Sequence, residues 1–96
     1  MWVLATYDIN TETAKGRRRL KKVAKICEGF GQRVQKSVFE CILNAAQYEQ
    51  FKYRLIKNID ENEDSLRFYR LTQGRPDTVE VFGINEVRDF SEPLVV

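Results

Sequence analysis

The 96-residue sequence contains no histidine. Without histidine, neither a Ser-His-Asp nor a Cys-His nucleophilic site can form, and a histidine-ligated zinc site and a histidine general base are excluded as well. Any catalysis by this chain must therefore use carboxylates with a hard metal ion. The alternative is a protein that only binds.

Cysteine, proline and glycine are scarce, at two, two and five residues. Cys27 and Cys41 lie in stretches with helix or strand character and lack the spacing of metal ligands. We therefore expect two small buried thiols in a reducing compartment. With 43% hydrophobic and 31% charged residues, the composition is that of a folded chain, and its length suits one domain with one modest core.

Long hydrophobic runs are missing too. No window approaches the roughly 20 apolar residues of a membrane span. The N-terminus lacks the basic segment of a signal peptide, and the apolar run that follows is too short for one. We therefore expect a cytoplasmic protein with no membrane partner.

Charge is segregated along the chain, although the net charge is only +2. The segment 15–36 carries nine basic residues and one acid, giving +8, whereas the rest carries seven basic and thirteen acidic residues, giving −6. A locally basic surface suits the phosphate backbone of a nucleic acid.

The first half of the chain predicts a strand, a helix and a strand region. A nearly continuous apolar run at 2–9 predicts a central strand that is buried on both faces. The apolar stripe from Leu20 to Cys27 predicts a helix over 15–28, ended by Gly29. The segment 33–43 is long for one strand and predicts either a tight hairpin or a pair bent around Phe39 and Glu40.

The second half predicts a helix and two strands. Asn44 followed by Gln47 predicts the N-cap of a helix that ends near Asn58. Residues 65–72 predict a strand, and 79–83 predict a short strand with Pro76 outside it. The order β-α-β-β-α-β with an extra short C-terminal strand predicts an α+β, ferredoxin-like sandwich.

Asp8 is the candidate metal ligand, because it ends the first apolar run. In this fold we expect it near Arg17 and Arg19, where the carboxylate stays ionised and suits a divalent cation, a phosphate bridged by that cation, or a salt bridge. An Asx turn or a helix-capping role would also explain an aspartate here. Since no second acid lies in the same strand, a metal site would need Asp8 from two chains, and the hypothesis is a homodimer with a shared site.

The stretch RVQKSVFE places Arg33, Gln35, Ser37 and Phe39 at alternate positions. Such a row suits polar contacts to a phosphate backbone or across a subunit interface. An exposed edge strand would show the same pattern.

Four separated motifs, taken together, resemble the CRISPR-associated endoribonuclease family, the smaller of the two core spacer-acquisition proteins. They are YDI at the end of the first strand, RRRLKKVAK in the first helix, GQRVQKSVFEC, and DSLRFYRL. The resemblance runs from Met1 to about Phe82. It implies a ferredoxin-like nuclease domain over 1–82 and a C-terminal tail at 83–96 that docks on the partner subunit or on the CRISPR integrase. A frayed chain end would also explain such a tail.

The resemblance also implies a homodimer in which Asp8 of both chains faces a Mg²⁺ ion. Nuclease function is implied for Tyr7, Asp8, Arg17, Arg19, Arg33, Ser37 and Phe39. Nucleic-acid binding is implied for Arg17, Arg18, Lys21, Lys22 and Arg33. The implied reaction is phosphodiester hydrolysis of single-stranded RNA, or in some members double-stranded DNA, by water that the metal activates.

A second role implied by the resemblance is a non-catalytic DNA-binding scaffold, in which the dimer bridges two dimers of the CRISPR integrase during spacer acquisition. A ribonuclease toxin of the same fold is a rival, because it too can have a strand-end aspartate. An RNA-recognition module shares the element order, but EGFGQRV lacks the alternating aromatics of its base-stacking strand.

Overall fold

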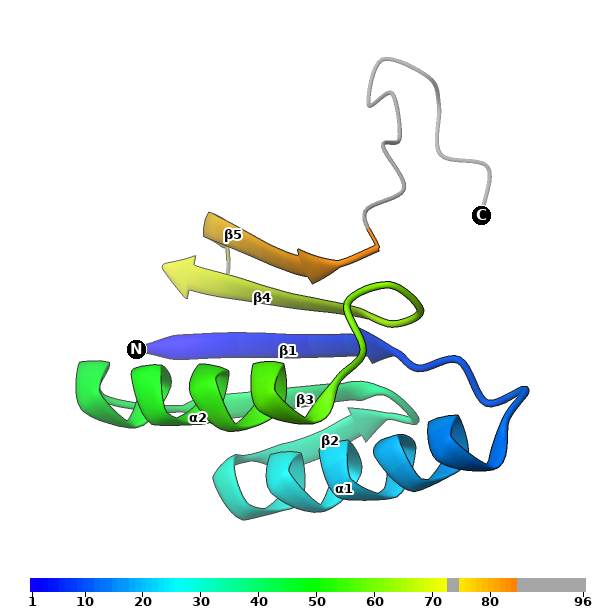
Figure 1. Cartoon of the computed structure of the whole chain (residues 1–96). Coiled ribbons are helices and arrows are strands. Elements are labelled where there is room, and N and C mark those ends of the chain that lie inside the picture. Colours follow the sequence, from blue (N-terminus) through cyan, green and yellow to red (C-terminus); the bar gives the residue numbers. More distant parts are fainter. Residues whose placement is uncertain (73–74, 85–96) are drawn as a thin grey trace.

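Five antiparallel strands and two helices make up the part of the chain that the structure describes, and both helices lie on one side of the sheet (Figure 1). The computed structural model describes the backbone of residues 1–72 and 75–84, and the side chains of these residues outside 72–78. The elements are β1 (Trp2–Asp8), α1 (Ala14–Phe30), β2 (Gln32–Gln35), β3 (Val38–Ile42), α2 (Ala45–Asn58), β4 (Ser65–Thr72) and β5 (Arg75–Gly83).

The sheet order β2-β3-β1-β4-β5 confirms the predicted ferredoxin-like α+β fold, with β5 added at one edge. The predicted docking tail lies almost wholly outside the described residues, which end at Ile84. None of the helices described here is long and apolar enough to cross a membrane.

Strand β1 is central, as predicted, but only one of its faces is buried. Val3, Ala5 and Tyr7 point into the core, whereas Trp2 is 47% exposed and Leu4 is half-buried. The prediction that both faces are buried is therefore wrong. Each helix connects two parallel strands that flank a third, and the usual right-handed crossover places both helices over the same face.

The core lies between this covered face and the two helices. Aromatic rings of both layers meet there, with the Phe51 ring 5.6 Å from that of Phe68 and 4.8 Å from that of Phe30. Cys27 and Cys41 are buried free thiols, as predicted, and burial raises their pKa values to about 12 and about 11. At neutral pH both stay protonated and act as small apolar side chains.

Helix α1 begins where the Thr13 side chain accepts a hydrogen bond from the Gly16 amide at 3.0 Å. It continues past Gly29, which was expected to end it, as far as Phe30. The amide of Gly31 then donates to the Cys27 carbonyl at 2.9 Å and caps the helix. Packing of Phe30 on Phe51 stabilises the two additional residues, so tertiary contact overrides the local glycine signal.

The two glycines within α1 should respond oppositely to alanine. A Cβ on Gly16 would collide with the backbone oxygen of Asn10, whereas a Cβ on Gly29 would meet nothing within 4 Å. We expect Gly29→Ala to stabilise the protein by about 0.5–1 kcal/mol through helix propensity, and Gly16→Ala to destabilise it by about 1–3 kcal/mol through overpacking. Urea unfolding of both variants tests this, and equal shifts in the same direction would contradict the close approach at Gly16.

The β2–β3 segment is a hairpin with its turn at Lys36 and Ser37, which is one of the two arrangements expected for it, and it is not a pair bent around Phe39 and Glu40. A register shift between Arg33 and Gln35 interrupts the pairing. The predicted alternation from Arg33 to Phe39 is therefore wrong, because it spans a bulge and a turn.

Helix α2 follows the prediction closely. The Asn44 side chain accepts from the Gln47 amide at 2.8 Å, the Gln47 side chain accepts from the Asn44 amide at 2.9 Å, and the helix ends at Asn58. Strand β5 begins at Arg75, four residues before the predicted start at 79, and it therefore includes Pro76, which was expected to lie outside it. That position is tolerated since β5 is an edge strand whose register shifts beside it, so a missing amide donor costs little.

Candidate functional site

Asp8 is the last residue of β1 and is exposed. Side chains alternate along a strand, so Asp8 lies on the face opposite the helices, together with Leu4 and Thr6. We call this surface the open sheet face. Its members outside 72–78 come from all five strands: Trp2, Leu4, Thr6, Asp8, Gln32, Gln35, Val38, Glu40, Ile42, Ser65, Arg67, Tyr69, Leu71, Val79 and Val81.

Arg17 and Arg19 do not pair with Asp8. Arg19 Nε lies 2.8 Å from Asp64 Oδ2, and its Nη2 lies 3.3 Å from Glu63 Oε2. Arg17 Nη1 donates to the Thr11 carbonyl at 3.1 Å. The predicted grouping of Asp8 with these two arginines is therefore wrong, because α1 covers one face of the sheet and Asp8 lies on the other.

Asp64, which the sequence did not single out, is the fully buried carboxylate of this region. Besides Arg19 it accepts hydrogen bonds from the backbone amides of Asn10 at 3.0 Å and Asp60 at 2.9 Å. Burial by itself raises the pKa of Asp64, but these hydrogen bonds outweigh it and hold the pKa below its ordinary value. Asp64 thus ties α1 to the loops after β1 and before β4.

The sequence signal for Asp64 was weak for a physical reason. It closes the acidic run ENED, and a run of acids is usually a solvated loop. Only the packed structure shows that Arg19, 45 positions away in the sequence, supplies its counter-charge.

Tyr7 and Phe39 are core residues on the helix side of the sheet. Both are buried, and their ring centroids lie 6.2 Å apart. The guanidinium of Arg33 lies 5.1 Å from the Phe39 ring centroid and 3.5 Å from the Glu28 carboxylate. Burial raises the pKa of Tyr7, whose hydroxyl donates to the Lys36 carbonyl at 3.3 Å.

Ser37 also has a structural contact here, because its backbone carbonyl accepts a hydrogen bond from the Tyr7 amide at 3.1 Å. The structure therefore gathers Tyr7, Arg33, Ser37 and Phe39 around the β2–β3 turn. It does not bring this group to Asp8, since Tyr7 and Phe39 face the core. Packing accounts for Tyr7 and Phe39, and the nuclease function implied for all four residues stays a prediction.

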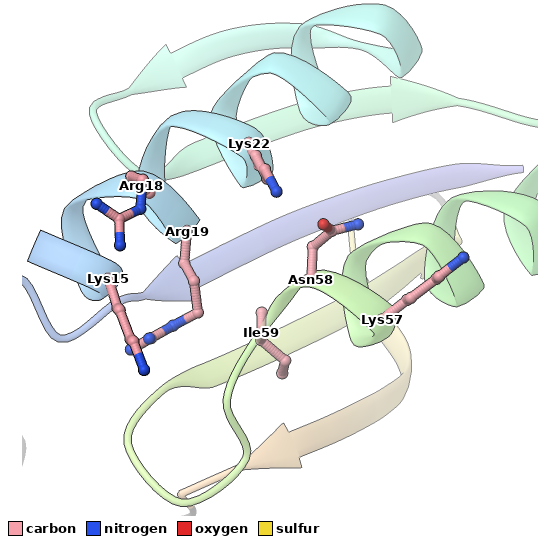
Figure 2. A pocket seen from close by; sticks show the side chains of 7 residues that line it. All are labelled: Lys15, Arg18, Arg19, Lys22, Lys57, Asn58 and Ile59. Carbon is pink, nitrogen blue, oxygen red and sulfur yellow. The ribbon is translucent and has the colours of Figure 1, made fainter.

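A second feature lies on the helix side, between the first turns of α1 and the end of α2 (Figure 2). It is a hollow of about 350 Å³ lined by Lys15, Arg18, Arg19, Lys22, Lys57, Asn58 and Ile59, and we call it the cationic hollow. Arg18 and Lys22 were expected to bind nucleic acid, and the structure places both here. The contribution of Lys57 from α2 was not foreseen.

The described residues hold no ready-made cluster of metal ligands. Among residues 1–71 and 79–84, whose side chains the structure describes, no three cysteine, aspartate or glutamate side chains come close enough together to hold a metal ion. Asp8 offers carboxylate oxygens, which suit Mg²⁺, but Glu40, the other carboxylate of the open sheet face among the described side chains, lies opposite Leu4, four positions along β1 from Asp8. The donor set fits a metal only if a second copy contributes its own Asp8.

Comparisons with known proteins agree on one family. A family model described as CRISPR associated protein Cas2 matches residues 1–79. The chain is 54% identical over 96 residues to CRISPR-associated endoribonuclease Cas2 1 of Moorella thermoacetica, with 100% of both chains covered. It is 47% identical over 95 residues to CRISPR-associated endonuclease Cas2 of Halalkalibacterium halodurans, with 99% of both covered.

A solved structure shows the same likeness. The crystal structure of Streptococcus pyogenes Cas2 matches with a TM-score of 0.71 and 56% sequence identity. The match covers 76% of this chain and 88% of that chain.

Proposed function

The chain belongs to the CRISPR-associated Cas2 family of nucleases, and we propose that it hydrolyses phosphodiester bonds of single-stranded RNA with Mg²⁺ held between two copies of itself. Its relatives are named as endoribonucleases or an endonuclease, so double-stranded DNA is the second substrate to test. Membership of this family also disfavours the ribonuclease-toxin and RNA-recognition alternatives.

The observation that carries the proposal is the position of Asp8 on the open sheet face. This face is rich in exposed apolar side chains, with Ile42 at 71% and Trp2 at 47% exposure. An apolar surface of this kind favours a protein partner. A second copy related by a twofold axis at the Asp8 end would cover it and bring two Asp8 carboxylates together.

The proposal gives Asp8 and Arg67 separate roles in hydrolysis. The two Asp8 carboxylates would hold Mg²⁺ through hard oxygen ligands. Magnesium would supply charge neutralisation at the phosphate and activation of the attacking water, which suits a chain without histidine. Arg67 lies on the same face, opposite Thr6 and two positions along β4 from the partner of Asp8, so it can hold the phosphate.

A second candidate function is the scaffold role in spacer acquisition with the CRISPR integrase. The specific observation in its favour is that the basic side chains of α1 lie on the opposite side of the sheet from Asp8. Nucleic acid can therefore bind along α1 without using the proposed metal site. In that role Asp8 is present but not required.

Leu4→Glu should dissociate the dimer and abolish hydrolysis together. Leu4 lies in the middle strand of the open sheet face, half-buried between Glu40 and Tyr69. An unpaired carboxylate buried there would weaken self-association by about 10²-fold or more. Sedimentation velocity and a Mg²⁺-dependent RNA cleavage assay give the two readouts.

The control for this variant is Ala46→Glu, at an exposed position in the first turn of α2 that is on the helix side and does not line the cationic hollow. It adds the same charge and should change neither readout. A Leu4→Glu protein that melts like the parent, is monomeric and still cleaves RNA at the parental rate would refute the shared site.

A further inference from the structure

Two charges of opposite sign lie among the apolar side chains of the open sheet face. Arg67 projects from β4 and Glu40 from β3, and both side chains are half-buried. Neither takes part in any of the ion pairs formed among the described residues. A second copy that covered this face would remove both charges from water, and a buried charge is costly unless it is paired. The dimer proposed above therefore needs a counter-charge for each of them.

Within one chain β1 keeps these two charges apart. Glu40 is opposite Leu4 on one side of that strand, and Arg67 is opposite Thr6 on the other side. Two strand spacings of about 4.8 Å each, and a shift of one same-face position along β1, therefore separate the two side chains. A second copy brings another Arg67 and another Glu40 to the same face, so it can supply both counter-charges.

A twofold axis that joins two Asp8 residues also decides which strands meet. Asp8 is the last residue of β1, so an axis that crossed the strand there would overlap only the ends of the two sheets. An axis parallel to β1 joins the two Asp8 residues and covers the whole face as well. Because β3 and β4 flank β1 on opposite sides (Figure 1), this axis stacks β1 on β1 and lays β4 of each copy over β3 of the other.

The side chain of Arg67 already reaches in the direction that a contact with β3 of a second copy requires. Its Nη1 donates to the Tyr69 hydroxyl at 3.4 Å. Tyr69 is two residues further along β4, in the same row of the sheet as Leu4 and Glu40. An axis parallel to β1 leaves every row at its own height, so Glu40 of the second copy lies in this row too. The Tyr69 hydroxyl thus draws the guanidinium toward the opposing carboxylate.

We propose that Arg67 of each copy pairs with Glu40 of the other, and that these two ion pairs set the register in which the Asp8 residues meet. The inference rests on the dimer of the proposed function, but it does not require that the dimer cleaves RNA. The twofold axis forms the pair twice, so no charge of either type is buried alone. The guanidinium has five N–H donors, which leaves one edge free for a phosphate.

The two ion pairs add a directional element to an apolar interface. Hydrophobic contact between the two faces is non-directional and allows them to slide over each other. A shifted register would leave Arg67 and Glu40 of both copies buried without partners, or would bring like charges together. The ion pairs therefore select the one alignment that also places Asp8 against Asp8.

Charge reversal tests this pairing. Arg67→Glu and Glu40→Arg each turn two attractions into two repulsions, so each variant alone should self-associate about 10²-fold more weakly than the parent, or worse. An equimolar mixture of the two variants should restore the dimer, because every arginine at these positions then faces a glutamate. Sedimentation velocity measures the association, and native mass spectrometry identifies the heterodimer by its mass.

Lys25→Glu and Glu61→Arg are the matched controls. They make the same two changes of charge at exposed positions on α1 and in the loop before β4, away from the open sheet face. Both controls should dimerise like the parent, alone and mixed. Thermal unfolding of all four variants checks that the fold is unchanged, and recovery of the dimer in the mixture shows independently that both reversed chains are folded.

The outcomes separate this pairing from the proposed nuclease. If Asp8→Asn still cleaves RNA, the nuclease proposal fails, and the pairing stands as long as the mixture dimerises. A dimeric parent whose single variants dimerise equally well, or whose mixture stays monomeric, would overturn the pairing alone. A parent that is monomeric at every concentration tested would overturn the pairing and the shared site together.

Discussion

Asp8→Asn should lower Mg²⁺-dependent cleavage of RNA by about 10²-fold or more, the size of effect expected when a group that stabilises transition-state charge is removed. The fold should not change, because Asp8 is exposed and its side chain makes no hydrogen bond or ion pair with the residues that the structure describes. Stability should stay within about 0.5 kcal/mol of the parent. A loss of cleavage in Asp8→Asn can therefore be assigned to the missing carboxylate and not to a change in the fold.

The measurement is cleavage of single-stranded RNA and of duplex DNA with Mg²⁺, after chelation by EDTA, and after Mg²⁺ is restored. Glu12→Gln is the control, since Glu12 is an exposed acid in the turn after β1. It should cut like the parent. An Asp8→Asn protein that cleaves as fast as Glu12→Gln would refute the metal site. If Asp8→Asn loses cleavage but still supports spacer acquisition in cells, the scaffold role would be the only one of the two that acquisition requires.

Asp64→Ala should destabilise the protein by about 3–5 kcal/mol, the range for breaking a buried ion pair from one side. The change leaves Arg19 without its main partner and leaves the amides of Asn10 and Asp60 without an acceptor. For a chain of this size each kcal/mol corresponds to about 4–8 °C in Tm. Glu63→Ala is the control, because Glu63 is 42% exposed and its pair with Arg19 contributes little, up to about 1 kcal/mol.

The contribution of Asp64 should depend on pH in a defined direction. Its pKa in the folded protein lies below the ordinary value of about 3.9 that it regains on unfolding. The stabilisation is therefore complete above about pH 4 and is lost as the pH falls through the lower folded-state pKa. Urea unfolding at pH 7 and at pH 2.5 should show a smaller difference between parent and Asp64→Asn in acid. A difference that is the same at both pH values would show that Asp64 does not act as a charged partner.

Local patterns in the sequence determined much of the fold. The pair Asn44 and Gln47 marks a capping box whose geometry depends only on neighbouring residues, and the structure shows it as expected. Apolar spacing identified both helices and the strands β1, β4 and β5, and it left the segment 33–43 as either a hairpin or a bent pair. The element order then left few topologies. The predicted end of an element was wrong where a contact with a distant residue decided it. At Gly29, for example, packing of Phe30 on Phe51 extends α1 beyond the predicted end.

The candidate site divides in the same way. The sequence by itself identified Asp8 as the carboxylate at the end of a central strand, the excess of cations in α1, and the lack of histidine that excludes most other chemistry. Tertiary structure alone decided that Asp8 faces away from Arg19, that Arg19 pairs with Asp64, and that Lys57 of α2 and Lys15 of α1 line the same hollow. Periodicity tells which residues share one face of one element, but which faces meet depends on how helices pack on a sheet, and that is fixed by contacts between residues far apart in the chain.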